Sequence, residues 1–139
     1  MFYDVCQQSL EEFFKAEWSL TEIAWDNVSF NPEPYTEFVR FSVLFGDGMQ
    51  RSVVKGCYRQ FGLVMVSVFT KPANGSSRSL ELASSAAEIL TSTIVTPTPP
   101  LVAPKVQLKT PDLYVSNKED RGWIMHQLSC PFYYDFTKE

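Results

Sequence analysis

Residues 35–90 constrain the fold of this chain more than any other stretch. Apolar side chains alternate through Phe38–Phe45, a pattern typical of a β-strand, and Tyr58–Thr70 has the composition and length of a second strand. A turn, Gly46–Gly48, follows the first strand, and a tight loop, Lys71–Ser76, leads from the second strand into a helix of small residues. This order predicts a compact scaffold, and it contains no reactive motif.

The two predicted strands are apolar on both faces near their centres, which predicts central strands in a sheet covered at least partly on both sides. Gly62 indicates a bulge or a close backbone approach inside the second strand. The polar segment Gly46–Gly56 is predicted to project as a hairpin arm. The second strand shows the two apolar faces well, with Val64, Val66 and Val68 on one and Leu63, Met65 and Phe69 on the other.

Two amphipathic helices are expected to cover the sheet. The first spans Asp4–Glu17, and Asp4 with a glutamine three residues later has the spacing of a capping box. The second spans Ser77–Thr91, with Ser76 or Ser77 as its N-cap. Their core-facing residues follow the helical period: Phe2, Cys6, Leu10 and Phe13 in the first, and Leu82, Ala83, Ala86, Ala87, Ile89 and Leu90 in the second.

The remaining segments predict a loop, a stiff connector and a final hairpin. Pro32 and Pro34 exclude a helix from the loop Asp26–Pro34, and Thr96–Pro104 holds four of the nine prolines. The last part is expected to form strands and an aromatic tail that docks on the sheet or on a neighbouring subunit. These are strands Lys105–Lys109, Leu113–Val115 and Trp123–Cys130, a turn at Asn117–Gly122, and the tail Pro131–Phe136.

Length and charge limit the possible functions. The 139 residues predict a single domain, residues 1–139. Residues 1–37 hold eight acids and one base, whereas residues 38–139 hold eight acids and eleven bases. This asymmetry suits complementary contacts between copies and also fits an ordinary solvated face. The net charge of −4 disfavours non-specific binding of DNA.

Neither a membrane segment nor a metal site is expected. The longest apolar run, Phe61–Phe69, is about half as long as a membrane helix, and the N-terminus lacks the pattern of a signal peptide. The three cysteines, Cys6, Cys57 and Cys130, are too scattered for a zinc site or a disulfide framework. We therefore expect no cofactor.

No group of residues indicates catalysis. His126 is the single histidine and is expected to be a packed or exposed structural residue without an orienting partner. The acid pair Glu11-Glu12 points to different helix faces, and the pair Glu119-Asp120 lies in a predicted turn. The loop Asn74–Ser77 opens a helix but lacks the lysine and spacing of a phosphate-binding loop. Bases and aromatics on the strands match single-strand nucleic-acid binders only loosely, without an RRM motif: Arg40, Tyr58, Arg59 and Phe61.

Four motifs, in order, resemble the tail terminator family of tailed bacteriophages and its phage-related relatives of unknown function. The loop Ile23–Pro32 is similar to the family pattern W-x-N-V-x-F-x-P, and Phe38–Val43 is similar to its V-R-aliphatic strand. Gly62–Phe69 precedes a Pro/Gly loop and an alanine-rich helix, and Trp123–Phe132 resembles a strand that ends in V-P-F. The segment Thr96–Pro104 departs from the family pattern, which leaves the connection between the second helix and the last hairpin open.

The resemblance implies an α+β fold, with a mixed or mainly antiparallel sheet of about five strands packed with two main helices, plus the projecting arm. It also implies a structural virion protein, assembled in the host cytoplasm, that is not an enzyme. Copies form a ring, about six in the well-known members, at the head-proximal end of the tail tube. The ring stops tube polymerisation and provides the head-joining surface. The implied partners are the chain itself, the tail tube protein and a neck or head-completion protein, with DNA only passing through the lumen.

Two other readings stay open: a different neck or head-completion protein on a related fold, and a small binding domain for a ligand or nucleic acid. For the ring, the acidic first third and the basic arm are a candidate pair of complementary surfaces. The residues expected at an oligomer or tube interface lie in the arm and in the loop before the second helix: Asp47, Gln50, Arg51, Lys55, Arg59, Lys71, Asn74 and Arg78.

Overall fold

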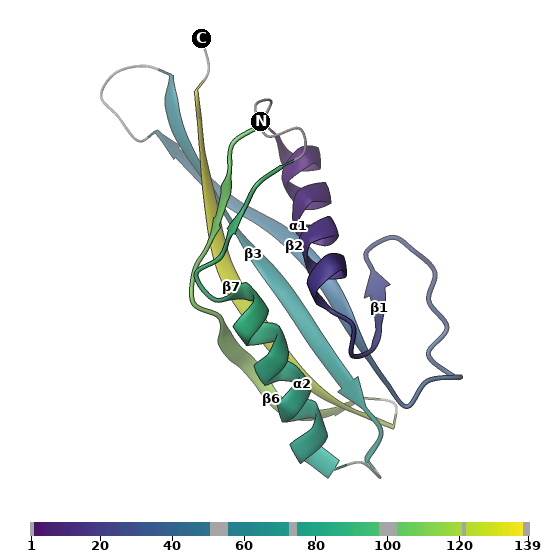
Figure 1. Ribbon diagram of the computed structural model, residues 1–139. Helices are drawn as coiled ribbons and strands as arrows, with labels where there is room; N and C mark the ends of the chain where they lie inside the picture. Colours follow the sequence, from purple (N-terminus) through teal and green to yellow (C-terminus); the bar gives the residue numbers. More distant parts are fainter. Residues whose placement is uncertain (1, 51–55, 73–74, 98–102, 121, 138–139) are drawn as a thin grey trace.

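A computed structural model describes residues 2–50, 56–72, 75–97, 103–120 and 122–137 of the chain. Within these ranges the chain forms two helices and seven strands (Figure 1). In chain order they are α1 (Tyr3–Glu17), β1 (Glu22–Trp25), β2 (Glu37–Gln50), β3 (Cys57–Thr70), α2 (Gly75–Leu90), β4 (Ile94–Val95), β5 (Val106–Leu108), β6 (Asp112–Asp120) and β7 (Trp123–Thr137).

The strands belong to one sheet, in the order β1-β2-β3-β7-β5-β4, and β6 also pairs with β7. β1 lies parallel to β2, and the other described pairs are antiparallel. The predicted α+β class, with two helices and a mixed, mainly antiparallel sheet, is therefore confirmed. The sequence predicted about five strands, and the short β1 and β4 extend the sheet beyond them.

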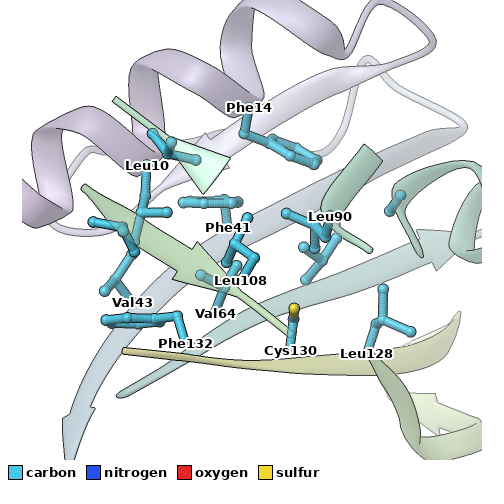
Figure 2. Packing of buried hydrophobic residues seen from close by; sticks show 14 of the residues in the cluster. Leu10, Phe14, Phe41, Val43, Val64, Leu90, Leu108, Leu128, Cys130 and Phe132 are labelled. Carbon is cyan, nitrogen blue, oxygen red and sulfur yellow. The ribbon is translucent and has the colours of Figure 1, made fainter. Parts of the chain in front are cut away.

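Both helices lie on the same face of the sheet (Figure 1) and enclose the main core with it. Phe14 of α1 stacks on Phe41 of β2 with ring centroids 4.8 Å apart, and Figure 2 shows the two rings within the larger cluster. Leu82 and Leu90 of α2 are fully buried in the same cluster. Burying a side chain of this size stabilises the fold by about 1.5–3 kcal/mol. The core therefore ties both helices to one side of the sheet.

The predicted cover of both sheet faces, at least in part, is observed, but the cover of the second face is small. Leu44 and Leu63 point away from the helices and are 50% and 37% exposed. Only one end of this helix-free face is covered, where Phe38 and Phe69 stack and Phe30, from the loop after β1, packs on Phe38. The reason is that both helices pack on one face, so the second apolar face has only a loop to cover it.

The arm differs from the prediction at its base. Gly46–Gly48 is not a turn, because β2 continues to Gln50 with a bulge between Phe45 and Gly48. Gly62 is a close backbone approach, as one of the two predicted options stated: a Cβ there would lie 2.6 Å from the carbonyl oxygen of Leu44 and would also collide with the ring of Phe132. The bulge therefore sits in the partner strand, next to the glycine.

Both predicted helix caps are wrong. α1 begins at Tyr3 behind Phe2, which has a positive φ of 64° and makes no side-chain capping bond. The ring of Phe2 instead packs edge-on against Phe136 of β7, at 6.3 Å between centroids, so a tertiary contact fixes the helix start. α2 begins at Gly75, which places Ser76 and Ser77 inside the helix and not at its N-cap.

The C-terminal part forms longer strands than predicted. The predicted turn Asn117–Gly122 is wrong, because β6 extends to Asp120 and β7 begins at Trp123. The aromatic tail docks on the sheet by continuing β7 to Thr137, in register with β3. Pro131 is tolerated within β7 because its backbone faces the junction where pairing with β6 ends and pairing with β5 begins; its carbonyl accepts from the Lys109 amide at 2.8 Å.

Candidate assembly surfaces

The predicted interface residues that the structure describes fall at two separate ends of the sheet. Asp47 and Gln50 are exposed at the end of β2, and Arg59 lies near the start of β3. Lys71 and Arg78 lie at the opposite end, after β3 and in the first turns of α2. Arg59 of β3 and Lys71, directly after this strand, are twelve residues apart, so the two ends are separated by roughly 40 Å. Arg51, Lys55 and Asn74 lie outside the described residues.

Two of the predicted cations are held within the subunit. Arg59 donates to both carboxylate oxygens of Asp135, at 2.7 and 3.0 Å, and these bonds raise the pKa of Arg59. Arg78 donates two bonds of 2.9 Å to Glu37 and one of 3.2 Å to Glu81. The bonds from Arg78 lower the pKa of the Glu37 carboxyl. Such bidentate pairs fix strands and helix in place, so these two residues have a structural role in the subunit.

Lys71 also makes an internal contact. Its ammonium lies 3.9 Å from the centroid of the Trp123 ring, which belongs to the small aromatic cluster on the helix-free face. Within the loop that covers this cluster, Asn27 adopts a positive φ of 61°, a conformation that asparagine tolerates better than most residues. The loop after β1, which contains Asn27 and Phe30, therefore closes one end of the helix-free face.

The most distinctive surface lies in the middle of the helix-free face, and we call it the sheet patch. Leu44 of β2, Leu63 of β3 and Pro131 of β7 form one row across three strands. Phe61 pairs with Tyr133 in a neighbouring row, where the rings lie 6.5 Å apart. The patch consists of Leu44, Phe61, Leu63, Met65, Pro131 and Tyr133.

Several features make the sheet patch resemble a protein-binding surface. A shallow hollow of about 460 Å³ opens between Leu44, Phe61 and Leu63. Polar groups border the patch at both ends: the Arg59–Asp135 ion pair on the arm side, and the row that contains Arg40 on the other side. An antiparallel sheet normally turns a polar face to water, and apolar patches with polar rims mark interaction sites. The sequence signal was the two-sided apolar pattern, read as burial within one subunit.

The single histidine and two of the three cysteines are buried in the described structure. His126 is 2% exposed on β7, and its Nδ1 lies 2.7 Å from the Ser79 hydroxyl oxygen of α2, so it is a packed structural residue. Burial raises the pKa of the Cys6 thiol to about 12 and that of Cys130 to about 11. Across the described ranges, no three histidine, cysteine or acidic residues gather as metal ligands. In those ranges, likewise, no helix is both long and apolar enough to cross a membrane.

Comparison with known proteins identifies the family. The family model for phage tail terminator proteins matches residues 6–111, which is more than half of the chain. The chain belongs to the phage tail terminator family. It is therefore a structural component of the phage tail, associated with the tail tube, and not an enzyme.

Solved structures share the fold of this chain. Fourteen chains of solved structures match this one. One of them superimposes with a TM-score of 0.67 at 18% sequence identity, covering 98% of this chain and 94% of its own. At this identity the likeness describes the fold alone. A search of curated proteins found no match.

Proposed function

We propose that copies of this tail terminator family member form a ring, of about six subunits, on the head-proximal end of the tail tube. The ring stops tube polymerisation and presents the surface that a neck or head-completion protein binds. DNA passes through the lumen without specific contacts, consistent with a net charge of −4. The ring is part of the virion and assembles in the host cytoplasm.

The observation that carries this proposal is the sheet patch. An apolar surface on which Leu44 and Leu63 are 50% and 37% exposed is unfavourable on a free protein, and burial against another protein removes it from water. The family match supplies the context, because the partners of a tail protein are other tail proteins. His126, Cys6 and Cys130 are buried, and the exposed apolar patch supports binding to another protein.

An amber mutation in the gene, followed by electron microscopy of the lysate, tests the proposal. We expect tails of irregular, excessive length that are not joined to heads. Tails of normal length that lack only the connection to heads would favour a neck or head-completion protein instead. Normal tails already joined to heads would overturn both functions. Expression of the unmutated gene from a plasmid is the control, and it should restore tails of uniform length.

A further inference from the structure

Two outward surfaces, on opposite layers of the molecule, carry apolar hollows with charges of opposite sign beside them. On the sheet side, Arg40 is exposed at one border of the sheet patch. Lys109 is exposed at the other, with its ammonium 5.6 Å from the centroid of the Tyr133 ring. Among the described residues, neither cation forms an ion pair with a carboxylate.

Three carboxylates lie near the sheet patch, and none of them forms an ion pair with Arg40 or Lys109 among the described residues. Asp135 is held by Arg59, and Asp26 accepts a hydrogen bond of 2.9 Å from Ser42. Asp112 is exposed on β6, in register with Ser129 of β7. Within the described part of the chain, Arg40 and Lys109 thus remain without a carboxylate partner at the border of the patch, where acidic groups of a binding partner can reach them.

On the helix side, a hollow of about 600 Å³ opens between the C-terminal ends of α1 and α2, and we call it the helix groove. Leu20 is 49% exposed there and Ile89 is half-buried, so the lining is apolar at its centre. Glu17 and Glu88 line the same hollow, and neither forms an ion pair in the part of the chain that the structure describes. The groove consists of Phe13, Glu17, Trp18, Leu20, Glu88 and Ile89, with small polar residues between them.

The acidic character continues along the outer surface of α1 and α2, which we call the helix layer. Asp4 and Glu12 are exposed on α1, where Lys15 is the exposed base. Asp4 and Glu17 lie roughly 20 Å apart along the helix axis. The guanidinium of Arg78 at the start of α2 is already held by Glu37 and Glu81. The helix layer therefore offers exposed carboxylates along most of the length of α1 and at the C-terminal end of α2.

We propose that neighbouring copies stack front to back, with the sheet patch of one copy packed against the helix groove of the next. Leu44 and Leu63 of the first copy then cover Leu20 of the second, and Arg40 and Lys109 face the carboxylates of its helix layer. A second copy is the occupant that fits because both halves of the contact, apolar centre and opposite charge, are present on one chain. The proposal rests on the ring proposed above and defines its repeating contact.

The geometry of the contact determines what it can build. The sheet patch and the helix groove lie on opposite layers, so each copy uses both surfaces at once. Such a contact is heterologous: it repeats around a ring when the rotation closes, and it leaves no pair of copies related by a two-fold axis. Cross-links between a residue of the sheet patch and a residue of the helix groove should therefore join many copies in series. They should not stop at a dimer.

Thiol cross-linking tests this signature. Leu20→Cys and Leu44→Cys are placed together in a Cys57→Ser background, since the described structure has Cys6 and Cys130 buried and Cys57 partly exposed. A short bismaleimide is applied to the purified protein at high concentration and to tails assembled with the variant. We expect a ladder of cross-linked multimers from the double variant, and none from either single variant. Leu44→Cys combined with Val28→Cys is the matched control, because Val28 is 59% exposed but lies outside the groove.

Three results would overturn the stacking. The first is the absence of a ladder from both the purified protein and the tails. The second is a dimer from Leu44→Cys alone, which would place two sheet patches face to face. The third is a cross-link from Leu44→Cys to a different tail protein. Tails of normal length without a ladder would remove this inference and leave the proposed function in place, whereas normal, head-joined tails in the amber mutant would remove the function itself.

Charge reversal gives a second measurement that does not depend on introduced thiols. Arg40→Glu with Lys109→Glu should weaken self-association about tenfold or more, and Glu17→Lys with Glu88→Lys should do the same. Mixing the two reversed proteins should restore association between them, because each supplies the charges that the other needs. Circular dichroism checks that both variants are folded. Two folded variants that associate as well as the original protein, alone and mixed, would contradict the proposed contact.

Discussion

The two faces of the sheet are built from the same three long strands, yet they meet different surroundings. On the helix-covered face, Val39, Val64 and Phe132 lie beneath α1 and α2 and are fully buried, with 0% of each residue exposed. On the helix-free face, Leu44 and Leu63 of the same strands are 50% and 37% exposed. Alternation along a strand thus creates two apolar faces, and the subunit itself covers only one of them.

This difference separates folding from assembly. Residues on the covered face are removed from water when the subunit folds, so they contribute to the stability of the isolated protein. Residues on the helix-free face contribute little to the subunit and gain burial only from a neighbour. Substitutions matched in size on the two faces therefore measure how completely the two roles are divided between them.

The largest effect on stability is expected at Phe14. Phe14→Ala removes a fully buried ring that stacks on both Phe41 and Trp18, and it leaves a cavity under α1. We expect the free energy of unfolding to fall by about 3–5 kcal/mol, measured by chemical denaturation. Leu63→Ala on the opposite face is the control and should lower it by less than about 1 kcal/mol. Similar losses from both variants would show that the subunit uses the two faces alike.

A smaller effect on the free energy of unfolding is expected at Gly62, within β3. Gly62→Ala places a Cβ against the Leu44 carbonyl and the Phe132 ring, so backbone or ring must move. The unfolding free energy should fall by about 1–3 kcal/mol. Gly46→Ala is the matched control because its Cβ meets nothing nearer than the Phe61 carbonyl, at 3.7 Å. Equal tolerance of the two substitutions in thermal denaturation would contradict the close approach.

The sequence predicted the elements that follow from local pattern. Strands over Phe38–Phe45 and Tyr58–Thr70, a first helix ending at Glu17 and the special role of Gly62 all appear in the structure. Errors arose where tertiary contacts decide the outcome. The predicted capping box at Asp4 does not form, and α1 instead begins behind Phe2, which packs on Phe136. The predicted Gly46–Gly48 turn is a bulge, because β3 provides pairing partners for β2 as far as Tyr58.

The candidate site was harder to predict, for a physical reason. Charged residues such as Arg59 and Arg78 stood out in the sequence, but their partners Asp135 and Glu37 are distant in sequence and become neighbours only in the folded sheet. The sheet patch was visible as a two-sided apolar strand. Which of its faces would receive helices depends on chain connectivity, and no local pattern records that.

A pH effect of intermediate size is expected at the covered face. Burial lowers the pKa of His126 below its usual value of 6.5. At a pH between these two pKa values, the folded protein holds the imidazole neutral while the unfolded chain binds a proton. Its contribution to stability is therefore complete above pH 6.5 and is lost as the pH falls through the lower, folded pKa, by up to about 1.4 kcal/mol per pH unit.

Comparison with a variant isolates the contribution of His126 to the pH dependence of stability. Unfolding is measured between pH 7 and about pH 5.5, above the range in which carboxyl groups such as Glu37 titrate. His126→Gln should flatten the slope in that interval, whatever its effect on absolute stability. A slope unchanged by His126→Gln would mean that the histidine is as accessible to protons in the folded protein as in the unfolded chain.

The smallest effect on stability, and the sharpest separation of the two faces, is expected from Leu44→Asp combined with Leu63→Asp. Both side chains already meet water in the subunit, so the unfolding free energy should change by no more than about 1 kcal/mol. The same carboxylates would be desolvated in any contact that buries the sheet patch, and an unpaired buried charge is strongly unfavourable. A phage that depends on this variant should therefore make tails of uncontrolled length.

Leu113→Asp, on a leucine that is 42% exposed on β6, is the control and should leave tail length unchanged. A stable double variant that still terminates tails normally would show that the helix-free face remains open to water in the assembled tail.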